Sequence, residues 1–344
     1  TMEMGGTSCD LILMHEGRVE STDELEVAGY HLRVPAVDIH TVSAGGGSIA
    51  RVDAGGVMTL GPDGAGSDPG PAAYGRGGTQ ATDTDAQLVL GRLPSGTFAG
   101  GTLSLDKEKA RGVIEDRIAK PLKINVESAA IGITRLQGQA LVHAVEQVSI
   151  ERGFDPRRFA LVSVGGAAAV HAAAIAKRLG CREVLVPRLA GVFCAFGMLN
   201  ADIRRDTVAT FIQPVKDESL PQAEAVFVEL EKAVAEALER QDVNSAATVF
   251  ERIVDIRYPG QQSILQVPYT ADASSMVKAY ENQHMAMYGH LQQAAPEFVA
   301  VRVIGVVPSM RIPAADVTKV PSTNPDPTSH RDVWLVADEI VRVP

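Results

Sequence analysis

Apolar residues in the first part of the chain recur in short runs that are separated by glycine-rich turns. One run lies at residues 11–14, a second begins at Val19, and a third spans residues 34–42. Short apolar runs bounded by turn residues predict β-strands. Residues 55–78 are dense in glycine, proline and aspartate, and this composition predicts a long ordered loop. A loop of that length inside a compact domain is usually functional or part of an interface.

The next part of the chain, from residue 107 on, has the pattern of helices. Residues 107–118 and 125–153 carry apolar positions at helical spacing, so we expect two helices there. The apolar run 159–164 predicts a buried strand, the alanine-rich stretch 167–179 a helix, and residues 183–187 another strand. A strand, a helix and a strand with short connections predict a βαβ unit with parallel strands.

The last third of the chain has a different character. Only three of the 32 glycines, namely Gly260, Gly289 and Gly305, follow residue 200, which indicates a domain boundary between 200 and 215. We therefore predict one domain at 1–210 and a smaller α+β domain at 211–344. The elements expected in the second domain are helices at 220–240 and 276–291, strands at 250–258, 263–267 and 299–307, a hairpin at Pro259-Gly260, a Pro-rich linker at 313–329 and a last strand around Trp334.

Composition narrows the class of protein. The 344 residues are 45% hydrophobic with a formal net charge of -10, which is typical of a soluble globular protein with two domains. No apolar run approaches the roughly 20 residues of a membrane span. The acidic balance, without a block of Lys or Arg, disfavours nucleic acid and anionic membranes as partners. The cysteines Cys9, Cys181 and Cys194 form no CxxC pair, so we expect neither disulfides nor a thiolate zinc site, and a cytoplasmic location.

The first candidate site is Gly5-Gly6-Thr7-Ser8, which stands between Glu3 and Asp10. Two glycines and two hydroxyl residues in a tight turn between strands can present backbone N–H groups and hydroxyls to a phosphate. A flanking carboxylate, Glu3 or Asp10, can hold Mg²⁺ through water. A plain glycine turn is the alternative, because the motif is short.

Two further glycine groups offer similar backbone surfaces. Gly45, Gly46 and Gly47 follow the strand predicted at 34–42, and Gly165-Gly166 end the strand predicted at 159–164. Glycine at a strand–helix joint lets a ligand approach the backbone near the helix N-terminus. Close packing of the strand on the helix is the alternative for Gly165-Gly166. We interpret His171, in the helix that follows, as a packed or surface residue rather than a catalytic one.

The sequence gives little support for other kinds of site, such as a metal cluster or a nucleophile motif. Asp68, Asp83 and Asp85 are candidate functional carboxylates, although aspartate in turns is more often structural. The eight histidines are scattered without an HxxH or HExxH motif, which argues against a metal cluster. Neither a GxSxG nucleophile elbow nor a GxxxxGK[ST] phosphate loop occurs.

Taken together, these residues resemble the hydantoinase A/oxoprolinase family. Its members include ATP-dependent hydantoinases, 5-oxoprolinases and one subunit type of acetone and acetophenone carboxylases. The resemblance runs from Glu3 to about Val307, and its most specific stretches are 40–48, 61–78, 149–157 and Arg257-Tyr258-Pro259-Gly260-Gln261.

The resemblance implies an α/β fold, namely the second domain of an actin-like (ribonuclease H-like) ATPase with a mixed sheet and flanking helices. Residues 5–10 would then be the second phosphate loop, residues 45–47 a neighbouring glycine turn, and Gly165, Gly166 and Ala167 the adenosine loop. The first ATPase domain, with its own phosphate loop, would lie upstream and is absent from this sequence. We therefore expect negligible ATPase activity from this chain alone.

The resemblance also implies ATP and Mg²⁺ as cofactors, a hydantoinase B-type subunit as partner in a hetero-oligomer, and a small cyclic amide as substrate. ATP would phosphorylate the amide oxygen before the ring opens, with Glu3 and Asp10 as the catalytic residues that orient Mg²⁺. A ketone carboxylase subunit, acting on acetone or acetophenone, is the alternative within the enzyme class. A degenerate, non-catalytic assembly subunit is the alternative from another class.

Three departures from the family pattern bear on these alternatives. Glu3 replaces an aspartate, Cys9 replaces a common threonine, and Ala168 and Ala169 stand where the family has Gly-Pro. The two alanines add a Cβ and free φ in a segment that should approach the adenosine. This change favours weaker nucleotide binding or the non-catalytic role.

Overall fold

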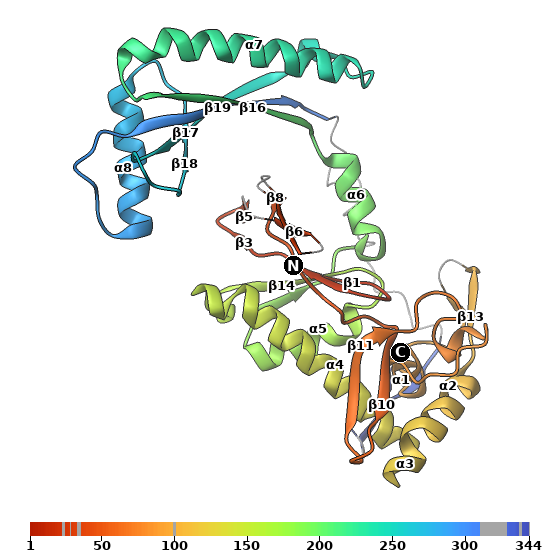
Figure 1. Ribbon diagram of the computed structural model, residues 1–344. Coiled ribbons are helices and arrows are strands. Elements are labelled where there is room, and N and C mark those ends of the chain that lie inside the picture. Colours follow the sequence, from red (N-terminus) through yellow and green to blue (C-terminus); the bar gives the residue numbers. More distant parts are fainter. Residues whose placement is uncertain are drawn as a thin grey trace. The chain divides into compact units, whose positions relative to one another are not determined.

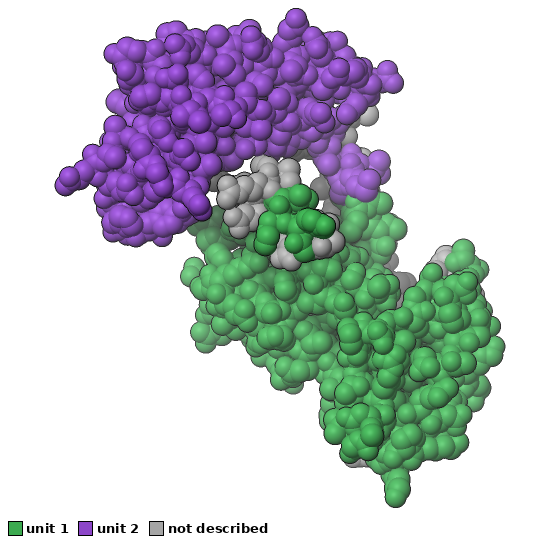
Figure 2. Space-filling model, in the orientation of Figure 1, with its two compact units in different colours: residues 1–196, 314–344 green, residues 197–313 purple. Residues whose placement is uncertain are grey.

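The computed structural model describes residues 1–22, 25–27, 29–32, 36–98, 101–309, 329–336 and 339–343. They form two compact units, drawn in green and purple in Figure 2. Unit 1 combines residues 1–196 with 314–344, and unit 2 spans residues 197–313. Each unit has its own buried core.

Unit 1 contains a five-stranded sheet with the strand order β15-β14-β1-β2-β9. β15, β14 and β1 run parallel, whereas β1, β2 and β9 are antiparallel neighbours. The predicted α/β fold with a mixed sheet is thus confirmed. The strands span Met2–Met4 (β1), Cys9–Leu11 (β2), His40–Val42 (β9), Ala160–Val164 (β14) and Glu183–Leu185 (β15).

Side chains alternate between the two faces of β1 and β2, as the strand period of two requires. Met2 and Met4 are fully buried, whereas Glu3 between them is partly exposed. Asp10 likewise stands between two buried neighbours in β2. Glu3 and Asp10 are direct partners in the antiparallel register, so the two carboxylates lie on the same face of the sheet.

Helices α4 (Val126–Val148) and α5 (Ala169–Leu179) pack on the apolar face of this sheet. α4 begins after Asn125, whose side chain accepts a hydrogen bond of 2.7 Å from the backbone N–H of Ser128. α5 connects β14 to β15, which confirms the predicted βαβ unit with parallel strands.

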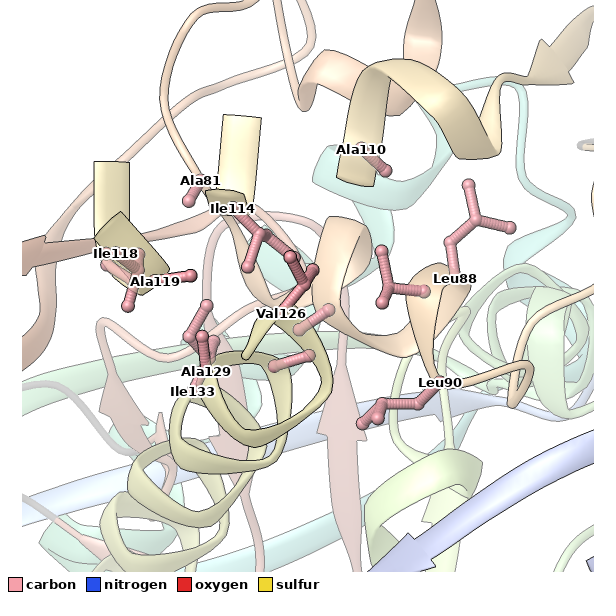
Figure 3. Packing of buried hydrophobic residues seen from close by; sticks show 14 of the residues in the cluster. Ala81, Leu88, Leu90, Ala110, Ile114, Ile118, Ala119, Val126, Ala129 and Ile133 are labelled. Carbon is pink, nitrogen blue, oxygen red and sulfur yellow. The ribbon is translucent and has the colours of Figure 1, made fainter. Parts of the chain in front are cut away.

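A second core of unit 1 is built from the segment between β9 and α4 and from the first half of α4. Figure 3 shows its side chains pointing toward one another from neighbouring helices. Strands β10 and β11 form an antiparallel hairpin beside it (Figure 1). The elements are β10 (Ser48–Val52), β11 (Met58–Gly64), α1 (Asp83–Val89), α2 (Lys107–Ile114), a π-helix (Glu115–Ala119) and α3 (Lys120–Leu122).

This region corrects one expectation and contains one helix that was not predicted. The loop predicted at 55–78 contains strand β11, because the backbone of Leu60 pairs with Ala50 and that of Thr59 with Arg51. Helix α1 was not predicted, although Thr82 and Asp85 form a capping box at its start.

The smaller elements of unit 1 are hairpins and short 3₁₀ turns. The paired strands are β3 (Met14–His15) with β4 (Arg18–Val19), β5 (Ser21–Thr22) with β8 (Ala36–Val37), β6 (Leu25–Val27) with β7 (Tyr30–Leu32), and β12 (Gly96–Phe98) with β13 (Leu103–Leu105). Among the described residues of both units, 3₁₀ turns occur at η1 (Ala72–Tyr74), η4 (Ile150–Arg152), η5 (Pro156–Arg158), η6 (Ala190–Val192), η7 (Asp217–Ser219) and η8 (Ser245–Ala247).

Unit 2 is an antiparallel sheet with the order β16-β19-β17-β18, and α7 and α8 share its apolar core. The hairpin of β17 and β18 and both long helices agree with the predictions from periodicity. β16 was not predicted. The elements are α6 (Phe193–Asn200), which crosses the unit boundary, β16 (Ile203–Pro214), α7 (Leu220–Glu239), β17 (Val249–Arg257), β18 (Leu265–Pro268), α8 (Ala273–Tyr288) and β19 (Glu297–Val307).

The division into units differs from the predicted domains in two ways. It falls at residue 197 because β16 pairs with β19 along its length. The last hairpin, β20 (Arg331–Val336) with β21 (Glu339–Val343), belongs to unit 1, where the backbone N–H of Trp334 donates to the carbonyl of Leu90 at 3.0 Å. The linker predicted at 313–329 lies outside the described residues except for Ser329.

Within the described parts of the chain, none of the helices combines the length and the apolar character needed to cross a bilayer.

Candidate functional site

The turn between β1 and β2 is formed by Gly5, Gly6, Thr7 and Ser8, and a hydrogen bond of 3.1 Å from the Gly5 N–H to the Ser8 carbonyl closes it. A Cβ at Gly5 or Gly6 would meet nothing within 4 Å, so both glycines border open space. The backbone N–H groups of Gly6 and Thr7 have no hydrogen-bond partner among the described residues. The turn therefore presents two free N–H donors and two hydroxyls to a ligand.

Glu3 and Asp10 flank this turn on one face of the sheet. The hydroxyl of Thr41 donates to Asp10 Oδ1 at 2.6 Å and orients that carboxylate. Burial, followed by the charge of Asp10, raises the pKa of Glu3 above its ordinary value. A bound cation would relieve this repulsion, because it favours the charged form of both carboxyl groups.

Gly45, Gly46 and Gly47 lie directly behind the turn. The N–H of Gly46 donates to the Gly5 carbonyl at 3.1 Å, and the N–H of Gly47 donates to the Gly6 carbonyl at 2.7 Å. A Cβ at Gly45 would stand 2.5 Å from the Gly6 carbonyl oxygen. These three glycines therefore support the turn, and the amides of Gly46 and Gly47 are not available to a ligand.

Gly165, Gly166 and Ala167 bring the start of α5 next to the same turn. Gly165 has a φ of +86°, and a Cβ there would stand 2.5 Å from the Met4 carbonyl oxygen and 2.6 Å from Glu3 Oε1. The N–H of Ala167 donates to the Met4 carbonyl at 2.9 Å. Gly166 is exposed and faces open space. Close packing therefore explains why residue 165 is a glycine, whereas the backbone of Gly166 is accessible to a ligand.

A small cavity of about 150 Å³ lies where these segments meet. Of the predicted site residues, it brings together Gly5, Gly6, Gly46, Gly166 and Ala167. The predicted residues that do not line it are Glu3, Thr7, Ser8, Asp10, Gly45, Gly47 and Gly165. Its other lining residues are Tyr74, Asp83, Thr84, Gln87, Leu93 and Val170.

Helix α1 completes this cavity. The backbone N–H and the hydroxyl of Thr84 both donate to the Gly46 carbonyl at 2.8 Å, which ties α1 to the glycines behind the turn. Asp83 and Gln87, one turn apart, face the cavity. From the sequence, Asp83 was only a weak candidate for a functional carboxylate, and Thr84 and Gln87 were not candidates. The capping box was the signal that could have revealed the helix.

His171 of α5 is buried against Asp83. Its Nε2 lies 2.9 Å from Asp83 Oδ2, and the two side chains are only 4% and 2% exposed. The amide of Gln87 donates to Asp83 Oδ1 at 3.1 Å. His171 is thus a packed residue, as predicted, but one held by a buried carboxylate that borders the candidate site.

A larger cavity of about 720 Å³ lies between α4 and α5 and shares Val170 with the small one. Its lining is mostly apolar, with Arg135 and Arg178 on the two helices. Both arginines are exposed, and neither forms an ion pair within the described residues. A volume of this size is typical of small-molecule sites.

The two alanines that depart from the family pattern cause no strain. Ala168 has a φ of -66°, ordinary helical geometry, and its side chain is fully buried in the core beneath the sheet. Ala169 is the first residue of α5 and is exposed. The added Cβ of Ala168 therefore points into the core and not toward the cavities.

The other candidate carboxylates are structural or exposed. Asp85 is fully buried and accepts hydrogen bonds from the backbone N–H groups of Ala73 (2.7 Å) and Thr82 (3.0 Å), while burial raises its pKa to about 6. Asp68 is exposed in a turn. Within the described ranges, no group of three or more His, Cys, Asp or Glu could hold a metal ion. A cation at Glu3 and Asp10 would need ligands from a phosphate or water.

Two other stretches that carry the resemblance, 149–157 and 257–261, form ion pairs away from the cavities. In the first, Asp155 and Arg157 form an exposed ion pair of 2.8 Å. In the second, Arg257 pairs with Glu297 at 2.8 Å, and Tyr258 is buried in the core of unit 2.

Comparison with known proteins defines the class. Residues 1–207 match the family described as hydantoinase/oxoprolinase, and this chain belongs to that family, as the resemblance predicted. It is 35% identical to the caprolactamase subunit alpha of Pseudomonas jessenii, over 98% of this chain and 50% of that protein. It is also 35% identical to the 5-oxoprolinase of Saccharomyces cerevisiae, over 77% of this chain and 21% of that protein.

Comparison with solved structures also supports this fold. The nucleotide-free structure of acetone carboxylase, from work on the mechanism of ATP-dependent acetone carboxylation, superposes with a TM-score of 0.84 at 26% identity, covering 99% of this chain and 51% of that one. This chain therefore spans about half or less of the length of the relatives it matches.

Proposed function

We propose that this chain is part of the ATP-using subunit of a multi-subunit enzyme that hydrolyses a cyclic amide, such as a hydantoin, 5-oxoproline or another lactam. ATP would phosphorylate the amide oxygen before the ring opens. The observation that carries the proposal is the convergence of Gly5, Gly6 and Gly166 at one cavity beside Glu3 and Asp10. The similarity to a caprolactamase and a 5-oxoprolinase supports the substrate class.

The phosphates of the nucleotide would bind at the turn between β1 and β2. Gly6 and Thr7 supply free N–H donors, and the hydroxyls of Thr7 and Ser8 stand beside them. Preorganised backbone donors of this kind stabilise negative charge on a transferring phosphoryl group without reorganising. Gly45, Gly46 and Gly47 contribute indirectly, because they hold the turn in place.

The adenosine would occupy the larger cavity between α4 and α5. The apolar side chains of Ile131, Val142 and Ile175 supply a surface for the base. Arg135 and Arg178 stand free to stack on it, as guanidinium groups do on aromatic faces. This cavity and the small one share Val170 as a lining residue, so the adenosine would lie near the turn that would hold the phosphates.

Mg²⁺ fits the pair Glu3 and Asp10 when it also binds phosphate and water, because Mg²⁺ is usually held by one or two carboxylates plus substrate phosphates. When bound, it would neutralise the charge that develops on the phosphates. Glu3 and Asp10 would orient it from one face of the sheet, and Thr41 fixes the position of Asp10.

A second candidate is the ATP-using subunit of a ketone carboxylase. The TM-score of 0.84 to acetone carboxylase favours it. The degenerate assembly role loses its main support, because the Cβ of Ala168 is buried in the core and leaves the cavities unobstructed.

Two experiments test the proposal. The first is isothermal titration of the full-length protein with Mg-ATP, with Thr7→Ala as the variant and Thr59→Ala, an exposed threonine on β11, as the matched control. We expect Thr7→Ala to weaken binding several-fold and Thr59→Ala to leave it unchanged. Absence of binding at millimolar nucleotide would sink the proposal.

The second experiment separates the two enzyme candidates. The complex is purified from its native source with its partner subunit, and ATP hydrolysis is measured with 5-oxoproline, caprolactam or hydantoin, and separately with acetone and bicarbonate. Stimulation by a cyclic amide supports the hydrolase. Stimulation by acetone with bicarbonate alone would support the carboxylase instead.

A further inference from the structure

A wall of polar side chains, of which Asp83, Gln87 and His171 are buried and Arg92 is partly exposed, separates the two cavities. Asp83 and Gln87 of α1 line the small cavity, whereas His171 and Arg92 line the large one. Polar contacts join the two sides of the wall in three places: His171 with Asp83 at 2.9 Å, His171 Nε2 with Gln87 Nε2 at 3.3 Å, and Arg92 with Gln87 at 3.5 Å. Each cavity is therefore bordered on one side by side chains of this wall.

Asp83 is held rigidly in this wall. His171 donates to its Oδ2 and Gln87 to its Oδ1, and both bonds leave further lone pairs on the carboxylate. The Asp83 side chain is only 2% exposed. A buried carboxylate without hydrogen-bond partners costs free energy, so the donors His171 and Gln87 stabilise it in this position.

The charge of Asp83 determines what the small cavity can accept. Among the described residues that line this cavity, Asp83 is the only one with a carboxylate and none is cationic. Phosphate groups held at the turn would therefore stay clear of Asp83 at the other side of the cavity, because like charges disfavour that contact. A neutral group with an O–H or N–H donor would instead gain a hydrogen bond to an ionised acceptor, which is stronger than a neutral one.

We propose that Asp83, held by His171 and Gln87, is the acceptor that binds a neutral hydroxyl or N–H group of the ligand in the small cavity. This inference rests on the proposed function. The cavity of about 150 Å³ offers roughly ten times the space that one enclosed water needs, which suits a small ring beside the turn. Two parts of the reacting ligands have this chemistry: the ribose hydroxyls of the nucleotide and the N–H of the cyclic amide.

Ligand analogues distinguish the two sources in the wild-type protein and do not depend on how a variant folds. In the first arm, the full-length protein is titrated with ADP and with 2′,3′-dideoxy-ADP. In the second arm, ATP hydrolysis by the native complex is measured with 5-oxoproline and caprolactam and with their N-methyl derivatives. We expect a loss of about 10- to 100-fold in one arm, because a hydrogen bond to a charged group is removed.

The variant Asp83→Asn connects this loss to the residue. An asparagine side chain cannot offer an ionised acceptor, so the difference between the parent ligand and its analogue should shrink to less than about threefold. Asp63→Asn, which removes a carboxylate exposed on β11, is the matched control and should keep the full difference. His171→Gln leaves Asp83 in place but removes its orienting donor, so it should reduce the difference partly.

The outcomes are distinct. A large effect of removing the ribose hydroxyls that disappears in Asp83→Asn assigns the ribose, and the corresponding effect of N-methylation assigns the amide. If wild type binds ADP but neither analogue differs from its parent, or if the difference persists in Asp83→Asn, the inference is overturned while the proposed function stands. If wild type neither binds nucleotide nor hydrolyses ATP with any amide, both are overturned.

Discussion

Replacing Gly45 with alanine should displace the turn between β1 and β2. The new Cβ would stand 2.5 Å from the carbonyl oxygen of Gly6 and 2.6 Å from the N atom of Thr7, both backbone atoms that cannot swing aside. Relieving this contact would break the hydrogen bonds from Gly46 and Gly47 to the turn, each worth about 1 kcal/mol. Overpacking adds about 1–3 kcal/mol. The φ of Gly45 is not in the left-handed region, so alanine recovers about 0.4–1 kcal/mol through the unfolded chain.

The expected net loss is about 2–4 kcal/mol in the free energy of unfolding, together with weaker binding of ADP. Urea unfolding measures the first and isothermal titration the second. Gly112→Ala is the matched control, because a Cβ at that position of α2 meets nothing within 4 Å. If Gly45→Ala unfolds at the same urea concentration as wild type but loses ADP binding, Gly45 contacts the ligand directly and the reasoning is refuted.

Three further predictions concern the same unit. Gly165→Ala should lower the free energy of unfolding by about 2–4 kcal/mol in urea titrations, because φ is +86° and the Cβ would collide with the Met4 carbonyl; wild-type stability would contradict this. Ala168→Gly should lose about 1 kcal/mol in the same assay and leave ADP affinity unchanged by titration calorimetry, since its Cβ is buried in the core; tighter binding would argue against that placement. Burial raises the pKa of Asp85 from 3.8 to about 6. The stability that protonated Asp85 contributes is therefore fully present below pH 3.8 and is lost as the pH rises through 6, which lowers the free energy of unfolding by about 3 kcal/mol. Between pH 4.5 and pH 7, the free energy of unfolding of Asp85→Asn should fall by less than that of wild type. A pH dependence equal to that of wild type would disprove the assignment.

The elements that the sequence revealed are those in which local pattern and tertiary packing agree. α4 follows its apolar period, and β14, α5 and β15 follow the alternation of strand, helix and strand. β11 was missed because three of its seven residues are glycine or proline, while its pairing with β10 depends on the partner strand. α1 was missed because seven residues are too few for a clear period, although its capping box is visible in the sequence.

The sequence by itself determined the family, the mixed α/β fold and the glycine turn between Glu3 and Asp10, because these depend on residue types at short spacing. Only the tertiary structure decided which of those residues face a ligand. It assigned Gly45, Gly46 and Gly47 to the support of the turn and Ala168 to the core. It also joined Asp83 to His171, which are 88 positions apart, at 2.9 Å. No local pattern encodes such a pair, since only the packing of α1 and α5 against the same helix, α4, brings the two side chains together.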